Sequence, residues 1–219
     1  MPEILNETEA RILGSLVEKQ LTTPEYYPQT LNALVNACNQ KSNRDPVVKY
    51  DEKTVENCLE VLRDRNLVYV FYGSTSRVPK YKHMLPSVFE LEPPDTAIIT
   101  ELLLRGPQTL GELRGRCERL HAFAGLGEVQ ETLDGLMRRD DPLVIKLPVQ
   151  PGQKEARFAH LLSGEIDIEA LAVAQATRAT RSSGVDSERV EKLEEEVTSL
   201  RAEVETLKET FDEFRKQFE

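Results

Sequence analysis

The chain has 219 residues, with 28 Lys and Arg against 38 Asp and Glu, a formal net charge of −10 and three cysteines. This length allows one or two domains, and three cysteines are too few, and odd in number, for a disulfide scaffold. Met1 is followed by charged residues, and no apolar run approaches the roughly 18 residues that a membrane span requires. The composition therefore favours a soluble cytoplasmic protein over a membrane or secreted one. The acidic balance also disfavours nucleic-acid binding that depends on bulk charge.

Residues 1–92 predict three helices followed by a β-hairpin. Asn6 and Glu9 have the spacing of a capping box, which begins a helix, and Asp51 is suited to begin another. Asn66 tolerates the left-handed conformation that ends many helices. The expected elements are helices over residues 6–23, 30–38 and 51–66, then strands over residues 67–72 and 78–82 around the turn-forming residues 73–76.

The same order of elements recurs in the second part of the chain. The apolar spacing predicts helices around residues 97–103, 110–113 and 129–136, then strands over residues 143–147 and 156–161. The composition shifts at residues 90–94, and again across residues 176–187, where Thr, Ser, Arg and Gly replace the apolar periodicity. The sequence therefore predicts a first domain over residues 1–92, a second over 93–175, a linker over 176–187 and a helix over 188–219.

Three helices followed by a hairpin is the order of a winged-helix domain, a helix-turn-helix with a hairpin appended. Other small α+β domains could share this order, but its recurrence in two copies favours the winged helix. We therefore expect a mainly α fold with small β-hairpins, built from two tandem winged-helix domains and a C-terminal coiled-coil helix.

The C-terminal helix carries apolar residues at alternating spacings of three and four, which is the heptad pattern of a coiled coil. Valine at most a positions, leucine at most d positions and opposite charges at the flanking positions favour a parallel homodimer. A helix that folds back on its own chain is the alternative. The residues expected to form the dimer are Val190, Leu193, Val197, Leu200, Val204, Leu207, Phe211, Phe214 and Phe218.

The sequence lacks the common motifs of catalysis and cofactor binding. It has no Gly-rich phosphate loop, His-Glu-x-x-His, Cys-x-x-Cys or Gly-x-Ser-x-Gly. Cys117 and His121 stand four apart, as two metal ligands on one helix face would, but no third or fourth ligand has a matching spacing. We therefore expect no enzymatic activity, no metal and no cofactor.

A winged-helix domain would contact DNA through its third helix and its hairpin. The third helices here are acidic, with Glu56 and Glu60 in the first copy and Glu128 and Glu131 in the second. Basic residues gather instead in the polar loop after residue 38, at the start of the third helix and on the first hairpin. Ordinary solvated charges are the alternative interpretation. The candidate phosphate contacts are Lys41, Arg44, Lys49, Lys53, Arg77, Lys80 and Lys82.

Carboxamides follow one edge of the expected second helix. Asn32, Asn36 and Asn39 have helical spacing, and Gln40 comes directly after them. Asn is a poor helix former, so its repetition predicts a polar row that is buried or faces a partner. Bonds within the loop and to the neighbouring helix are the alternative.

The stretch Thr-Thr-Pro-Glu-Tyr-Tyr-Pro at residues 22–28, with residues 31–46 and the opening helix at residues 9–19, resembles the YceH-like family of bacterial proteins. The likeness continues in Gly-Pro-Gln-Thr at residues 106–109 and Arg114, reaches about Leu162 and extends to a heptad-bearing C-terminus. It implies tandem winged-helix domains. It supplies no activity, substrate or catalytic residue that could be transferred to this chain.

Two hypotheses follow from these patterns. The first is a DNA-binding, transcription-related protein that uses the basic loop and hairpin. The second is a scaffold that binds another protein through its winged-helix domains without touching DNA. Fold alone does not decide between them. The expected partners are double-stranded DNA or an unidentified protein, together with a second copy of the chain.

Overall fold

The computed structural model describes residues 4–72, 78–149 and 153–166. The chain divides into two compact units, residues 1–166 and residues 167–219, and all described residues lie in the first. The described part is a mixed α+β structure, as the sequence predicts, with seven α-helices and two small antiparallel sheets of three strands each. The expected linker and coiled-coil helix lie outside the described residues.

The first repeat contains the three expected helices and the hairpin, with three further short elements. Its elements are α1 (Glu7–Thr22), the 3₁₀ turn η1 (Pro24–Tyr26), β1 (Gln29–Thr30), α2 (Leu31–Cys38), α3 (Glu52–Asp64), β2 (Val68–Tyr72), β3 (Pro79–His83) and α4 (Leu85–Phe89).

Side-chain caps begin α1 and α3, and a left-handed residue follows α3, where the sequence places these signals. Asn6 accepts a bond from the Glu9 backbone N–H, and Glu9 accepts one from the Asn6 N–H, which forms the predicted capping box. Asp51 caps α3 by accepting a bond from the Thr54 N–H at 2.7 Å. Asn66 follows α3 with a φ of 56°, in the left-handed region. The predicted starts of α1 and α3 are therefore confirmed, and so is the residue that ends α3.

The second repeat follows the same order. Its elements are α5 (Pro93–Arg105), β4 (Gln108–Thr109), α6 (Leu110–Arg116), η2 (Cys117–Arg119), α7 (Leu126–Met137), β5 (Val144–Lys146) and β6 (Arg157–His160). Thr109 caps α6 as Thr30 caps α2, each by accepting a bond from the backbone N–H three residues later.

Each sheet gains a third strand that the sequence did not predict. The strand orders are β1-β3-β2 and β4-β6-β5, so a two-residue strand before the second helix of each repeat pairs with the last strand of the hairpin. Thr30 lies opposite Lys80 in the first sheet, and Thr109 lies opposite Arg157 in the second. Two residues are too few to display a period of two, which explains why pattern analysis missed these strands.

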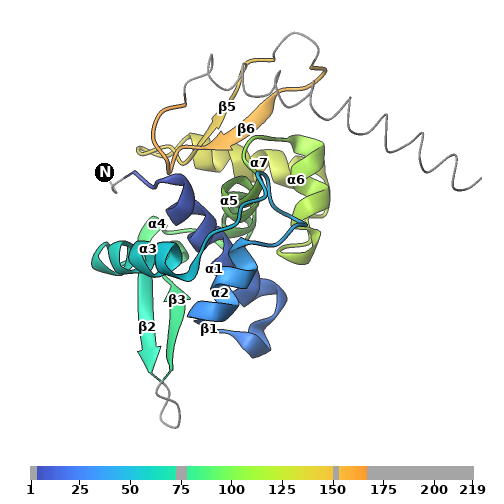
Figure 1. The fold of residues 1–219 in the computed structure, drawn as a ribbon. Helices are drawn as coiled ribbons and strands as arrows, with labels where there is room; N and C mark the ends of the chain where they lie inside the picture. Colours follow the sequence, from blue (N-terminus) through green and yellow to red (C-terminus); the bar gives the residue numbers. More distant parts are fainter. Residues whose placement is uncertain (1–3, 73–77, 150–152, 167–219) are drawn as a thin grey trace, which may run out of the picture. The chain divides into compact units, whose positions relative to one another are not determined.

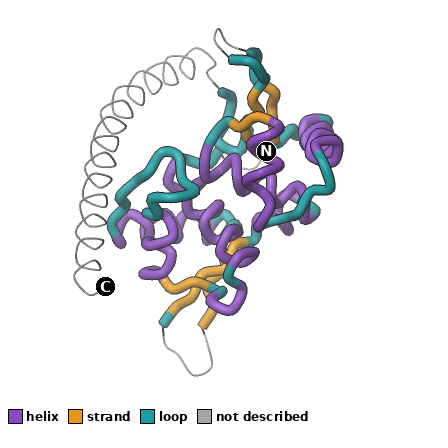
Figure 2. The backbone as a smooth tube through the Cα atoms, turned by 90° about the vertical axis from the view of Figure 1, so that its right-hand side faces the viewer, coloured by secondary structure: helices purple, strands orange, loops and turns teal. Residues whose placement is uncertain are grey.

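The two repeats pack through their first helices. In Figure 1, α1 and α5 lie side by side in the middle of the first unit, and their contact is the most extensive between any two of the described helices. Figure 2 shows helices between two groups of strands at opposite ends of this unit. Gly14 allows the close approach, because a Cβ at that position would lie 3.0 Å from Leu104 Cδ2 and 3.1 Å from Leu103 Cβ. Buried apolar residues from both repeats therefore form one continuous core.

Candidate nucleic-acid interface

The structure separates the expected phosphate contacts into two groups. Lys80 and Lys82 lie on β3, with Lys82 exposed, while Lys41 and Lys49 are exposed on the loop between α2 and α3 and Lys53 on the first turn of α3. That loop runs to the second repeat, where the Asp45 N–H donates to the Leu104 carbonyl at 3.0 Å. The hairpin extends in a different direction (Figure 1). Arg77 lies outside the described residues.

Arg44 does not belong to this set, and the prediction for it is wrong. Its side chain has no solvent exposure and forms an ion pair with Glu18 of α1, with 2.6 Å between Arg44 Nη2 and Glu18 Oε2. It also donates to the carbonyls of Ala37 and Asn43. A guanidinium occupied in this way holds the loop against α1 and α2 and cannot reach a phosphate.

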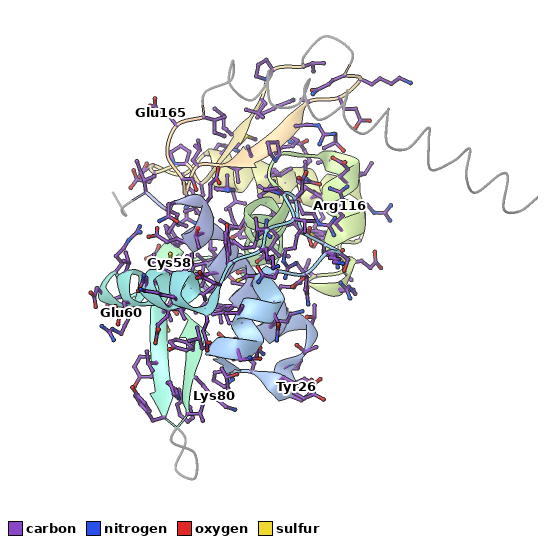
Figure 3. All side chains as sticks on the ribbon, in the orientation of Figure 1. Tyr26, Cys58, Glu60, Lys80, Arg116 and Glu165 are labelled. Atoms are coloured by element: carbon purple, nitrogen blue, oxygen red, sulfur yellow. The ribbon has the colours of Figure 1, made fainter. Side chains whose placement is uncertain are left out.

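The third helices present acidic surfaces, as expected. In α3 the side chains of Glu52, Glu56 and Glu60 are exposed beside Lys53, and Figure 3 shows Glu60 on this helix. In α7 Glu131 is exposed, and Glu128 accepts a bond from the Ala124 N–H at 2.7 Å. Carboxylates on these faces repel phosphate, which disfavours the insertion of α3 or α7 into a DNA groove.

The first hairpin carries aromatic and basic side chains on the face turned away from the core. Tyr69 lies opposite Lys82, and Phe71 lies opposite Lys80, so each aromatic ring shares a face with a lysine. Tyr69 is 60% exposed and Phe71 46% exposed, whereas Val68 on the other face is buried. We call Tyr69, Phe71, Lys80 and Lys82 the aromatic–lysine face. Its lysines suit phosphate, and its rings suit sugars or bases.

The carboxamide row divides into one structural residue and an exposed pair. Asn39 donates to the Tyr50 carbonyl at 2.8 Å and accepts from the Tyr50 N–H at 2.7 Å, which ties the end of α2 to the loop. Asn32 and Asn36 are exposed, and Asn36 donates to Asn32 at 3.1 Å. Asn32 and Asn36 are therefore not buried, and a partner-facing role for them stays a prediction. Gln40 is partly exposed directly after Asn39.

A short repeated motif is the sequence signal for the short strands β1 and β4. Pro-Gln-Thr-Leu occurs at residues 28–31 and again at residues 107–110. In both copies the Gln and Thr form the short strand, the Gln side chain donates to carbonyls of the preceding turn, and the Thr caps the helix. The motif therefore aligns the two repeats residue by residue around the short strands.

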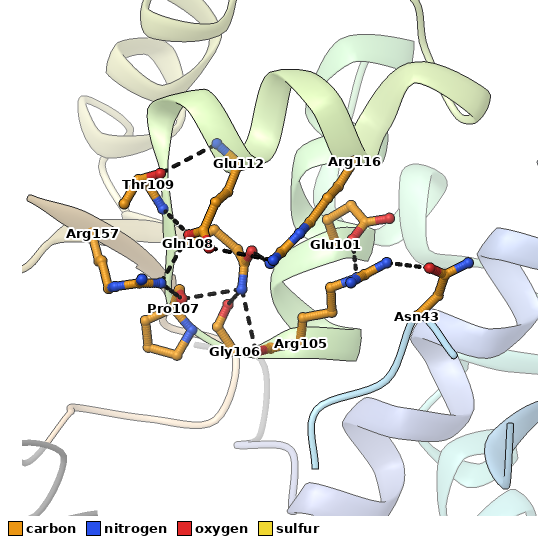
Figure 4. Close-up of polar contacts among 10 residues, drawn as sticks. All are labelled: Asn43, Glu101, Arg105, Gly106, Pro107, Gln108, Thr109, Glu112, Arg116 and Arg157. Carbon is orange, nitrogen blue, oxygen red and sulfur yellow. Dashed lines mark hydrogen bonds and ion pairs between the residues drawn. The ribbon is translucent and has the colours of Figure 1, made fainter. Parts of the chain in front are cut away.

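In the second repeat, ion pairs fill the region beside β4 and the start of α6. Glu112 accepts from the Thr109 N–H and from Arg157 Nη1, both at 2.9 Å, and pairs with Arg116 at 3.3 Å. Arg116 also donates to Gln108 (Figure 4). The carboxylate of Glu112 is thus surrounded by donors from three elements.

In the first repeat the corresponding region is a hollow. Ala33 stands where the second repeat has Glu112, because each is three residues after the capping Thr. The hollow has a volume of about 470 Å³. It is lined by Lys19, Thr23, Glu25, Tyr26, Pro28, Gln29, Thr30, Ala33 and Lys80. Figure 3 shows Tyr26 and Lys80 at the same end of this repeat.

Two buried titratable groups, His83 and Cys38, lie in the core. Burial lowers the pKa of His83 to about 4, and the backbone N–H of the same residue donates to the Tyr27 hydroxyl at 2.8 Å. Burial also raises the pKa of the Cys38 thiol to about 11, despite its hydrogen bond with Ser15 and the nearby Arg44 and Arg11.

His121 pairs with Glu128 at 3.4 Å rather than with Cys117. Within residues 4–72, 78–149 and 153–166, no three His, Cys, Asp or Glu side chains gather as a metal site would require.

Comparison with known proteins gives a consistent result over the whole chain. The family model described as "Protein of unknown function, DUF480" matches residues 5–153. A UPF0502 protein of Pelobacter propionicus is 53% identical over 221 residues, covering 100% of both chains. One from Geobacter sulfurreducens is 50% identical over 220 residues, again covering 100% of both.

A third organism supplies a similar match. A UPF0502 protein of Koribacter versatilis is 51% identical over 200 residues, covering 91% of this chain and 92% of its own. Among the described helices, none is long and apolar enough to cross a membrane. With a family model and full-length relatives in agreement, the chain belongs to the DUF480 family, whose members in these bacteria carry the name UPF0502.

Proposed function

We propose that the chain is a non-enzymatic DNA-binding protein with two winged-helix domains, and that the aromatic–lysine face contacts the DNA backbone. The twofold order of three helices and a hairpin supports the winged-helix assignment. The observation that carries the function is the pairing of Tyr69 with Lys82 and of Phe71 with Lys80 on one exposed face. This face combines charge for phosphates with apolar surface for sugars and base edges.

The proposed contact uses the hairpin in place of the third helix. Glu56 and Glu60 are exposed on α3, and their charges oppose approach of that helix to the backbone. A hairpin reaches a groove without bringing those carboxylates close to phosphate. Because few lysines are involved, binding is expected to be weak for one chain and sensitive to salt. A dimer formed by residues 188–219 would offer two such faces and strengthen binding through avidity.

The test is a fluorescence-anisotropy titration of the full chain with random duplex DNA, at ~50 and ~150 mM salt. Lys82→Ala should weaken binding and reduce the log–log salt slope by about 0.9, the value for one phosphate contact. Lys154→Ala makes the same charge change at an exposed residue of the second repeat and should leave the slope unchanged. Lys49→Ala tests the loop in the same way. Failure to bind at ~50 mM salt would reject the proposal.

A second candidate function is that of a protein-interaction scaffold. The observation that favours it is the row of exposed carboxylates at Glu52, Glu56 and Glu60, which suits a basic protein surface better than DNA. The same titration separates the two functions. For this purpose a basic peptide replaces the DNA as the probe. Binding that is found only with the peptide, and that Glu56→Lys and Glu60→Lys abolish, would support the scaffold.

A further inference from the structure

The two repeats differ at two aligned positions beside the short strands, where Glu112 and Arg116 of the second repeat correspond to Ala33 and Ala37 of the first. The paired residues Thr30 and Lys80 in the first sheet correspond to Thr109 and Arg157 in the second. Both pairs place a cation next to a helix-capping threonine. The second repeat adds the carboxylate of Glu112, whereas the first has Ala33. The first repeat therefore keeps the strand cation, as Lys80, but lacks both the internal anion and the helix cation Arg116.

The second repeat shows what this arrangement binds. The Glu112 carboxylate accepts the Thr109 N–H and Arg157 Nη1 at 2.9 Å each, and it also pairs with Arg116 (Figure 4). A backbone N–H at the start of a helix together with a cation suits an oxyanion. The internal comparison shows that an oxyanion fits this geometry when one is present.

The hollow of the first repeat retains positive charge around the corresponding place. Lys80 has no carboxylate partner among the described residues, and Lys19 has only a 3.6 Å contact with Glu18. Glu18 is itself bound more closely by Arg44, at 2.6 Å. Glu25 is the single carboxylate lining the hollow, and it is exposed on η1. The two lysines outnumber it.

We propose that this hollow binds an external phosphate group in the position that the Glu112 carboxylate occupies in the second repeat. Lys80 contacts the phosphate as Arg157 contacts Glu112, Lys19 provides a second ammonium, and the Thr30 N–H takes the place of the Thr109 N–H. Lys80 belongs to both the hollow and the aromatic–lysine face. A phosphate of the DNA backbone bound there would be continuous with the DNA contact, so this part of the inference rests on the proposed function.

The decisive variant is Ala33→Glu, which restores the internal carboxylate of the second repeat and lets the chain fill its own site. Asn36→Glu is the matched control, because it adds the same charge to the same helix at an exposed residue that does not line the hollow. Ala33→Glu should weaken binding of duplex DNA about tenfold and lower the salt slope by about 0.9. Asn36→Glu should change the affinity less than about twofold, since its charge is exposed and screened.

A second measurement tests the site without DNA. Inorganic phosphate should shift the backbone amide resonances of Thr30 and Ala33 in the parent protein and leave residue 30 unmoved in Ala33→Glu. Lys80→Gln should reduce the phosphate-induced shifts if Ala33→Glu does not fold. Acetate that moves these resonances in place of phosphate would overturn the assignment of phosphate.

The outcomes separate the site from the proposed function. Phosphate shifts without DNA binding would support the site with free phosphate as its ligand and would reject the DNA-binding function. DNA binding that Lys82→Ala weakens and Ala33→Glu leaves unchanged, with no phosphate shifts, would keep the function and overturn the site.

Discussion

Glu18 and Arg44 form an ion pair inside the first repeat, with 2.6 Å between Glu18 Oε2 and Arg44 Nη2. Burial alone would raise the pKa of Glu18, but the hydrogen bond and charge of Arg44 outweigh it, and the pKa of this carboxyl is lowered. Arg44 also donates to the Ala37 carbonyl at 2.8 Å. The pair therefore fixes the loop after α2 to α1, the helix that joins the two repeats.

Breaking this pair should destabilise the fold. Arg44→Met leaves the Glu18 carboxylate buried without its partner and should lower the unfolding free energy by about 3 to 5 kcal/mol. Lys41→Met, at an exposed residue of the same loop, should change it by less than about 0.5 kcal/mol. Urea unfolding followed by circular dichroism measures both. Adding Glu18→Met to Arg44→Met should recover part of the loss, and equal stability of the parent and Arg44→Met would contradict the assignment.

The packing of α1 against α5, which connects the two repeats, can be tested at Gly14. Gly14→Ala places a Cβ about 3 Å from the side chains of Leu103 and Leu104 on α5, so overpacking should cost about 1 to 3 kcal/mol. Gly135→Ala is the control, because it lies in α7 with open space around a new Cβ. Helix propensity predicts that this change stabilises by up to about 1 kcal/mol. Thermal unfolding that orders the two variants the other way would show that α1 and α5 do not pack closely.

His83 should make stability depend on pH. Burial lowers its pKa to about 4, whereas an unfolded histidine titrates near 6.5. The unfolded chain therefore binds more protons between these values, and stability present above pH 6.5 is lost as the pH falls toward 4. At pH 5 the stability lost through His83 is about 2 kcal/mol. His83→Gln should reduce this loss in urea unfolding at pH 7 and pH 5, while His121→Gln should retain it; an equal loss in both variants would exclude His83 as its source.

The carboxamides of α2 should differ in their effect on stability. Asn39→Ala removes two hydrogen bonds with the Tyr50 backbone and leaves those groups without a partner, which should cost about 1 to 3 kcal/mol. Asn36→Ala loses one exposed bond to Asn32 and should cost little. Melting curves of the two variants compare them directly. A larger shift for Asn36→Ala would indicate that the exposed pair has a contact outside residues 4–166.

The sequence predicts correctly those features that depend on residues close together in the chain. The Asn6–Glu9 capping box and the Asp51 cap depend on residues three apart, so their signals are complete in the sequence. The sequence alone predicts an exposed Arg44, because its partner Glu18 is 26 residues away and meets it only after packing. The hollow beside Ala33 was missed for a related reason, since it becomes visible only when the Pro-Gln-Thr-Leu motif aligns Ala33 with Glu112.

Residues 188–219 should form a parallel homodimeric coiled coil, a prediction that rests on the sequence alone. Valine at position a and leucine at d favour two parallel strands, and the flanking Glu, Lys and Arg residues attract at the g and e′ positions. Leu200→Asp with Leu207→Asp would bury charge at the seam, so size-exclusion chromatography with light scattering should change from dimer to monomer. Glu205→Asp is a conservative control outside the a and d positions. A parent chain that is monomeric at ~100 μM would contradict the dimer and favour a helix that folds back on its own chain.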